Sequence, residues 1–90
     1  MLEGSVTVVN QLGLHARAAA QLVRLAGKFR CRITLRRDDS GAFANAKSIL
    51  SVLALAAPVG TDLTLRTEGV DEKEAFDTVS ELFANGFGEI

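Results

Sequence analysis

Cysteine and histidine are scarce in this 90-residue chain, and their scarcity narrows the chemistry open to it. The single cysteine, Cys31, excludes an intrachain disulfide framework and a metal site built from several cysteines. With one histidine, His15, and no cysteine pair, metal ligation is not expected. Cys31 lies in an alternating run, where we expect it to pack as a small apolar side chain.

Long apolar runs and a leader-like N-terminus are also missing. No apolar run approaches the roughly 18 residues of a membrane span. The first five residues lack the basic and apolar regions of a signal peptide. We therefore expect a cytoplasmic protein with no membrane partner.

Positive and negative charges are nearly balanced. Ten Lys and Arg residues against eleven Asp and Glu residues leave a net charge of −1, so no global field favours nucleic acid. The five phenylalanines form no paired stacking motif on a strand, which argues against a single-stranded RNA platform. Neither glycine-rich phosphate loop, GxGxxG or GxxxxGK(S/T), occurs, and no cofactor is predicted. Any recognition of a charged ligand must therefore be local.

The composition is that of one globular domain. The hydrophobic fraction of 48% and the charged fraction of 23% are close to the average for a folded protein, so disorder is not expected. Ninety residues are too few for two cores and enough for one. A single domain, residues 1–90, is therefore predicted.

Hydrophobic periodicity predicts four strands and three helices in the order β-α-β-β-α-β-α. The strands are expected at 5–9, 31–36, 42–45 and 62–67, and the helices at 16–28, for about two turns after Ser48, and from the candidate N-cap Asp71 to the Asn85-Gly86 stop signal. Each helix has an apolar face and each strand a polar one. The predicted fold class is therefore α+β: an open-faced β-sandwich whose four-stranded, mostly antiparallel sheet carries the three helices on one face.

His15 immediately precedes the alanine-rich start of the first predicted helix. There the backbone N–H groups of Ala16, Arg17 and Ala18 and the positive end of the helix dipole favour an anion. Arg17 is a cation in the first turn, where the dipole disfavours it, so an anion that binds there explains it better than helix stability does. No serine lies near enough in sequence for a Ser-His-Asp arrangement. What remains is nucleophilic catalysis by the imidazole itself, or a module that only holds an anion without covalent chemistry.

A second candidate surface follows Ser48, the predicted N-cap of the short apolar helix. Val52 and Leu55 can face the core together, which leaves Ile49, Leu50 and Leu53 partly exposed as an interaction patch. The alternative is that this helix is buried on both sides. Along the first helix, a basic stripe that includes Arg24 and Lys28 is either a solvated face or part of the same partner surface.

Three motifs resemble the HPr family, the histidine-containing phosphocarriers of the bacterial phosphotransferase system, and the resemblance runs essentially end to end. They are Gly13-Leu14-His15-Ala16-Arg17 before an alanine-rich helix, Asn45-Ala46-Lys47-Ser48-Ile49-Leu50 at the start of a short apolar helix, and Gly60-Thr61-Asp62-Leu63-Thr64-Leu65 before Glu68-Gly69. The resemblance implies a monomeric carrier rather than a turnover enzyme.

The resemblance also implies roles for individual residues. His15 would take a phosphoryl group on Nδ1 from phosphorylated enzyme I, itself charged by phosphoenolpyruvate, and pass it to an enzyme IIA domain for sugar uptake. Arg17 would contact the phosphoryl group. The patch of Ile49, Leu50 and Leu53 would dock both partners. Ser48 resembles the serine that an ATP-dependent HPr kinase/phosphorylase modifies, where the added charge would disturb docking.

Two departures from the family pattern leave a related role open. Ala18 stands where the family usually has proline, which adds a backbone N–H to the first turn and removes a fixed φ. The hairpin from Arg36 to Ala44 is about two residues longer than in many members. A paralogue of the nitrogen-related branch, or one acting mainly in regulation, would fit the same motifs.

Overall fold

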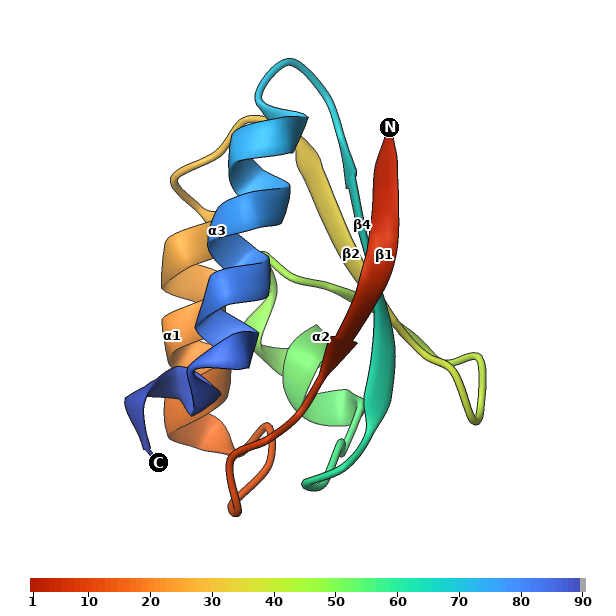
Figure 1. The fold of residues 1–90 in the computed structure, drawn as a ribbon, viewed down its shortest axis with the longest axis vertical. Helices are drawn as coiled ribbons and strands as arrows, with labels where there is room; N and C mark the ends of the chain where they lie inside the picture. Colours follow the sequence, from red (N-terminus) through yellow and green to blue (C-terminus); the bar gives the residue numbers. More distant parts are fainter. Residues whose placement is uncertain (90) are drawn as a thin grey trace.

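The computed structural model describes residues 1–89 and has the predicted order of elements. They are β1 (Leu2–Thr7), α1 (Ala16–Ala26), β2 (Arg32–Arg37), β3 (Phe43–Asn45), α2 (Ile49–Ala54), β4 (Asp62–Glu68), α3 (Glu72–Ala84) and a 3₁₀ turn, η1 (Gly86–Gly88). In Figure 1, α1 and α3 run side by side and, with α2, cover one face of the sheet. The predicted α+β open-faced sandwich is therefore confirmed. The final turn, η1, was not predicted.

The four strands form one sheet in the order β1-β4-β2-β3, and all three pairs are antiparallel. The pairing sets Leu35 opposite Leu65 and Val6 opposite Leu63, so these side chains share the face that the helices cover. Because side chains alternate along a strand, Thr34 and Arg66, also paired, lie on the open face. Thus one face of the sheet is apolar and the other polar.

The first strand begins earlier than alternation predicts. β1 extends back to Leu2 because Leu2 pairs with Thr67 of the long strand β4, although Gly4 is a poor strand former. A Cβ at Gly4 would lie 2.7 Å from the ring of Phe76, so the glycine lets α3 approach the strand closely. Val6 and Val8 are buried as predicted, while β1 itself ends at Thr7. Tertiary pairing, rather than local propensity, determines the start of this strand.

The core lies between the sheet and the helices. Its largest fully buried apolar side chains come from every layer: Phe83, Leu22, Ile33, Leu35, Leu63, Leu65, Val8, Val52 and Val79. Full burial of one such leucine or valine contributes about 1.5–3 kcal/mol. Cys31 is also buried, as predicted, and burial followed by the neighbouring Asp71 raises the pKa of its thiol, which disfavours reactivity. Within residues 1–89, no helix combines the length and the apolar character that crossing a membrane requires.

Asp71 stands before α3 as predicted but does not cap it. Its carboxylate accepts hydrogen bonds from the backbone N–H groups of Arg30 at 2.8 Å and Cys31 at 2.9 Å, and makes no cap bond to its own helix. These bonds, the one from Arg30 first, lower the pKa of Asp71 against the opposing effect of burial. The prediction that Asp71 caps α3 was wrong, because the backbone just before β2 lies close enough to bind its carboxylate. Asp71 therefore ties the start of α3 to the start of β2.

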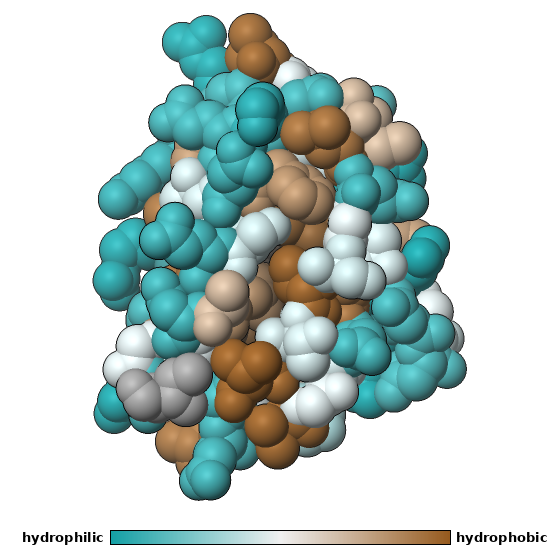
Figure 2. Space-filling model, viewed as in Figure 1, coloured by the Kyte–Doolittle hydropathy of each residue, from teal (hydrophilic) through white to brown (hydrophobic). Residues whose placement is uncertain are grey.

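A shallow groove separates α3 from β1. It is lined by Val6, Val9 and Phe83 together with smaller side chains, and Figure 2 shows apolar residues reaching the surface between these two elements. The helix thus covers the edge strand only in part.

Candidate functional site

His15 is the N-cap residue of α1, and the loop before it is held in place by the loop that follows α2. His15 has an extended backbone (φ −75°, ψ −178°), and its side chain makes no cap hydrogen bond. Leu14 is buried, and its N–H donates to the carbonyl of Ala57 at 2.9 Å. Gly13 has φ +69°, and a Cβ there would lie 2.6 Å from the same carbonyl oxygen. The close approach of the two loops therefore requires glycine at position 13 and sets where His15 stands.

The first turn of α1 presents donors to this site. Because Ala16, Arg17 and Ala18 are the first three helical residues, their N–H groups have no partner within the helix. The first bond of the turn is donated by Ala19 to the carbonyl of His15 at 2.8 Å. Ala18 is fully buried, whereas Ala16 and Arg17 are exposed. The predicted anion-binding backbone is thus in the conformation that the prediction requires.

Glu89 contacts the histidine, although it lies 74 residues further along the chain. Its Oε2 is 2.5 Å from His15 Nε2, and its Oε1 accepts a hydrogen bond from Asn10 Nδ2 at 3.1 Å. The side chains of His15 and Glu89 are 27% and 12% exposed. Hydrogen bonds from Asn10 and then His15, and the charge of Arg17, hold the pKa of Glu89 below its usual value against the effect of burial. The sequence prediction missed this residue.

The turn that carries Glu89 is anchored to the core. Phe87 is buried, and its ring meets that of Phe83 edge to face, with centroids 5.0 Å apart. The backbone of Phe87 is left-handed, with φ +58°, and Gln21 Nε2 donates to its carbonyl at 3.1 Å. A bulky residue adopts this conformation only where its surroundings compensate for the strain. The position of Glu89 therefore follows from packing and not from the end of α3 alone.

Arg17 faces a depression next to the histidine. Gln11, Leu12 and Gln21 line it together with Arg17 and the turn Phe87–Glu89. Arg17 is exposed, lines the same depression as Glu89, and its charge acts on that carboxylate. Among residues 1–89, no group of three or more His, Cys, Asp or Glu side chains is placed to hold a metal ion. The charge that could meet an anion here comes from Arg17 and the helix start.

The exposure predicted for α2 is confirmed. Ile49 is 38% and Leu50 76% exposed, Leu53 is partly buried, and Val52 and Leu55 are buried. The alternative of burial on both sides is therefore wrong. Ser48 caps the helix as predicted, because its Oγ accepts from the N–H of Ser51 at 3.4 Å. The basic residues Arg24 and Lys28 of the predicted stripe are both exposed.

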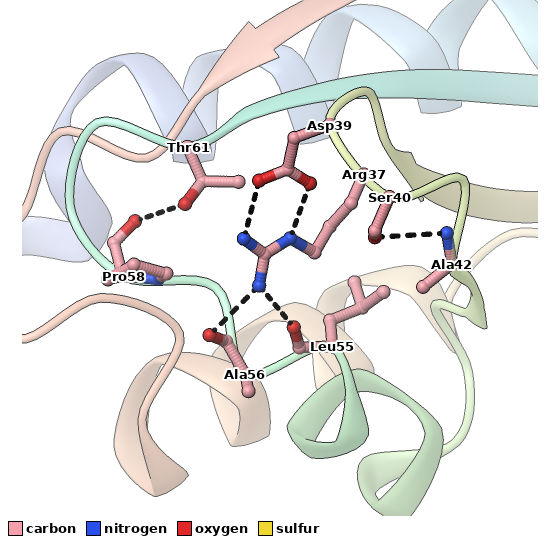
Figure 3. Close-up of polar contacts among 8 residues, drawn as sticks. All are labelled: Arg37, Asp39, Ser40, Ala42, Leu55, Ala56, Pro58 and Thr61. Atoms are coloured by element: carbon pink, nitrogen blue, oxygen red, sulfur yellow. Dashed lines mark hydrogen bonds and ion pairs between the residues drawn. The ribbon is translucent and has the colours of Figure 1, made fainter.

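The long hairpin between β2 and β3 holds the other end of α2. Figure 3 shows Arg37 between Asp39, which binds its guanidinium through both carboxylate oxygens, and the carbonyls of Leu55 and Ala56. The distances to these two carbonyls are 2.9 and 3.2 Å. The Arg37 guanidinium binds carbonyls that have no partner within α2, and its positive charge complements the negative end of the α2 dipole. Arg37 and Asp39 of this hairpin therefore hold the C-terminal end of the helix that carries the apolar patch.

Comparison with known proteins supports the family resemblance that the sequence motifs predict. The family model described as the PTS HPr component phosphorylation site matches residues 2–85. The phosphocarrier protein HPr of Cupriavidus necator is 48% identical over 89 residues, which cover 99% of this chain and 98% of that protein.

Solved structures give the same result. HPr-C-His from Thermoanaerobacter tengcongensis is 38% identical, with a TM-score of 0.92 over 100% of this chain and 99% of that one. An HPr dimer from the same organism is also 38% identical, with a TM-score of 0.77 over 99% and 100% of the two chains. The class defined by this fold and site is that of small open-faced sandwich proteins with a histidine at the start of the first helix. Within it, the chain belongs to the HPr family, the phosphocarriers of the bacterial phosphotransferase system.

Proposed function

We propose that this chain carries a phosphoryl group on His15, which it accepts from phosphorylated enzyme I and donates to enzyme IIA domains for sugar uptake. The observation that carries the proposal is the placement of the only histidine: partly exposed, at the N-terminus of α1, beside backbone N–H groups without helical partners and next to Arg17. A phosphoryl group on the imidazole would accept hydrogen bonds from Ala16, Arg17 and Ala18 and an ionic contact from the Arg17 guanidinium.

The role is that of a carrier and not of a turnover enzyme. The chain is both the acceptor in one transfer and the donor in the next, so each molecule returns to its starting state after meeting two partners. We propose that it acts as a cytoplasmic monomer without a cofactor. The exposed apolar residues Ile49, Leu50 and Leu53 would dock both partners, and Arg24 and Lys28 on α1 would supply charge complementary to acidic groups of those partners.

Ser48 is proposed as a regulatory phosphorylation site for an HPr kinase/phosphorylase. Its hydroxyl caps α2, and a phosphate there would still meet the positive end of that helix, so the fold would tolerate the modification. The new charge would lie beside Ile49 and Leu50, which are the residues proposed to dock enzyme I. Modification at Ser48 would therefore weaken docking without unfolding the protein.

The phosphocarrier proposal is tested by incubation with phosphoenolpyruvate and enzyme I. We expect one acid-labile phosphate per chain, seen as a mass increase that is lost at low pH. His15→Ala should take up none, while Glu74→Gln, an exposed change on α3, should behave as the wild type. Phosphate on the His15→Ala protein would contradict the assignment. Reversible binding of phosphate with no covalent product would instead favour the non-covalent module.

The proposal for Ser48 has its own test. Treatment with ATP and an HPr kinase should add one acid-stable phosphate, which fragmentation by mass spectrometry should locate at Ser48. Ser51, which lies one turn further along α2, is the matched control and should remain unmodified. Phosphate at Ser51 alone, or at neither serine, would remove the claim.

A further inference from the structure

The carboxylate of Glu89 restricts the protonation of His15. A carboxylate only accepts hydrogen bonds, so the 2.5 Å contact between Glu89 Oε2 and His15 Nε2 requires the proton to be on Nε2. In the neutral imidazole the lone pair is then on Nδ1. The two ring nitrogens point in different directions, so the carboxylate leaves Nδ1 open.

We propose that Glu89 is a positioning residue for phosphoryl transfer: from the turn after α3 it holds the Nε2–H form of His15 and so directs the reaction to Nδ1. The inference rests on the proposed phosphocarrier function. It also explains, from contacts within this chain, why the phosphoryl group would be carried on Nδ1, as the resemblance to the family implies.

The contacts of Glu89 explain why its carboxylate faces the imidazole in one orientation. Asn10 is fully buried, and its Nδ2 donates to the carbonyl of Gly13 at 2.8 Å and to Glu89 Oε1 at 3.1 Å. Because the Asn10 amide already binds Gly13, it cannot turn over to offer its oxygen to residue 89. One oxygen of Glu89 therefore accepts from Asn10 and the other from His15, and both must be acceptors.

The carboxylate of Glu89 also complements the positive charge that develops on the imidazole during the reaction. The Nδ1 lone pair forms the bond to phosphorus, and the bond between phosphorus and the donor breaks with its electron pair leaving on the donor. The imidazole, still protonated on Nε2, gains positive charge as the bond forms, and Glu89 stabilises this charge through the Nε2–H hydrogen bond. In the donation step the electron pair of the N–P bond returns to Nδ1, and His15 leaves as neutral imidazole with its Nε2 proton in place.

Two substitutions at position 89 distinguish this role from a structural one. In Glu89→Gln the single carbonyl oxygen faces Asn10, so the amide NH₂ faces His15 Nε2 and forces the proton to Nδ1, where it blocks attack. We expect the rate of phosphorylation to fall on the order of 100-fold in this variant. In Glu89→Ala both the Nε2–H and the Nδ1–H forms of His15 are accessible, and we expect the rate of phosphorylation to fall about 10-fold. Loss of packing alone would make alanine the worse variant, which is the opposite order.

The experiment combines nitrogen-15 spectra of the free protein with transfer kinetics from enzyme I. In the wild type we expect Nε2 protonated and Nδ1 not; in Glu89→Gln the assignment should reverse, and in Glu89→Ala both forms should be populated. The loss should appear in kcat, with the KM for the carrier unchanged. Glu81→Gln, an exposed glutamate of α3, is the control and should match the wild type in both measurements.

Three results would overturn the proposal: Nδ1 protonated in the wild type, wild-type rates in both variants, or faster transfer in either, since the last would mean that Glu89 only shields His15. The spectra need no phosphate donor. If the wild type takes no phosphate, the proposed function fails, while the spectra still decide the role of Glu89.

Discussion

The N-termini of α1 and α2 differ in what their first side chains do. Ser48 caps α2 with its own hydroxyl, so its side chain stabilises the helix that it precedes. His15 makes no cap bond to α1 and is held instead by Glu89, at the far end of the sequence. A side chain with no capping role can react without loss of helix stability. The start of α1 therefore leaves its first side chain free for the proposed chemistry, whereas the start of α2 uses its first side chain to stabilise the helix.

The largest effect is expected when the cation is removed from the first turn of α1. Arg17→Ala should slow phosphorylation of His15 on the order of 100-fold, because one preorganised donor to the developing charge is lost. Arg17→Lys keeps the charge but not the planar pair of donors, and should lose less. Single-turnover transfer from phosphorylated enzyme I measures both. Equal rates in Arg17→Ala and the wild type would mean that Arg17 is a solvated residue.

The second change tests whether the approach of the two loops places His15. Gly13→Ala puts a Cβ against the Ala57 carbonyl in a left-handed backbone, and should lower the free energy of unfolding by about 3 kcal/mol. Gly41→Ala is the matched control: Gly41 is also left-handed, with φ +76°, but no atom lies within 4 Å of the added Cβ. It should lose only about 1 kcal/mol. Urea denaturation gives both values, and equal losses would show that the close approach is unimportant.

The third change addresses the N-terminus of α2. Ser48→Ala removes the cap and should lower the free energy of unfolding by about 1 kcal/mol. Ser48→Asp restores an acceptor and places a negative charge at the positive end of the helix, so stability should return to the wild-type value. Transfer from enzyme I should nevertheless slow by about 10-fold in Ser48→Asp, because its charge lies at the proposed docking patch. An aspartate variant with wild-type transfer would argue against regulation at this position.

The smallest effect concerns the third helix start, where Asp71 caps no helix but binds the backbone of Arg30 and Cys31. Its pKa is lower in the folded than in the unfolded protein, so its contribution is present above the unfolded value of about 3.8 and is lost as pH falls through the folded pKa. Asp71→Asn should therefore remove part of the loss of stability seen on acidification. Thermal melts from pH 6 to pH 2 measure this, and parallel curves for the two proteins would contradict it.

Much of the fold could be predicted because its signals are local. Alternation marked Ile33 and Leu35 as buried, and the serine before an apolar run marked the start of α2. The site could be predicted only in part. His15 and Arg17 are neighbours in the sequence and share one helix turn, whereas Glu89 reaches His15 through a turn whose left-handed Phe87 has no local signature. Long-range contacts such as these depend on tertiary packing, as does the use of Asp71 by β2.

The position of Glu89 also has a practical consequence for handling the protein. In Figure 1 the N-terminus lies at one end of the molecule and the C-terminal turn at the other, beside the start of α1. A peptide fused on the C-terminal side would lie close in sequence to Glu89, which is hydrogen-bonded to the imidazole. One fused before Met1 would begin at the opposite end. Affinity tags, fluorophores and surface attachments are therefore best placed at Met1, where they leave the surroundings of His15 open.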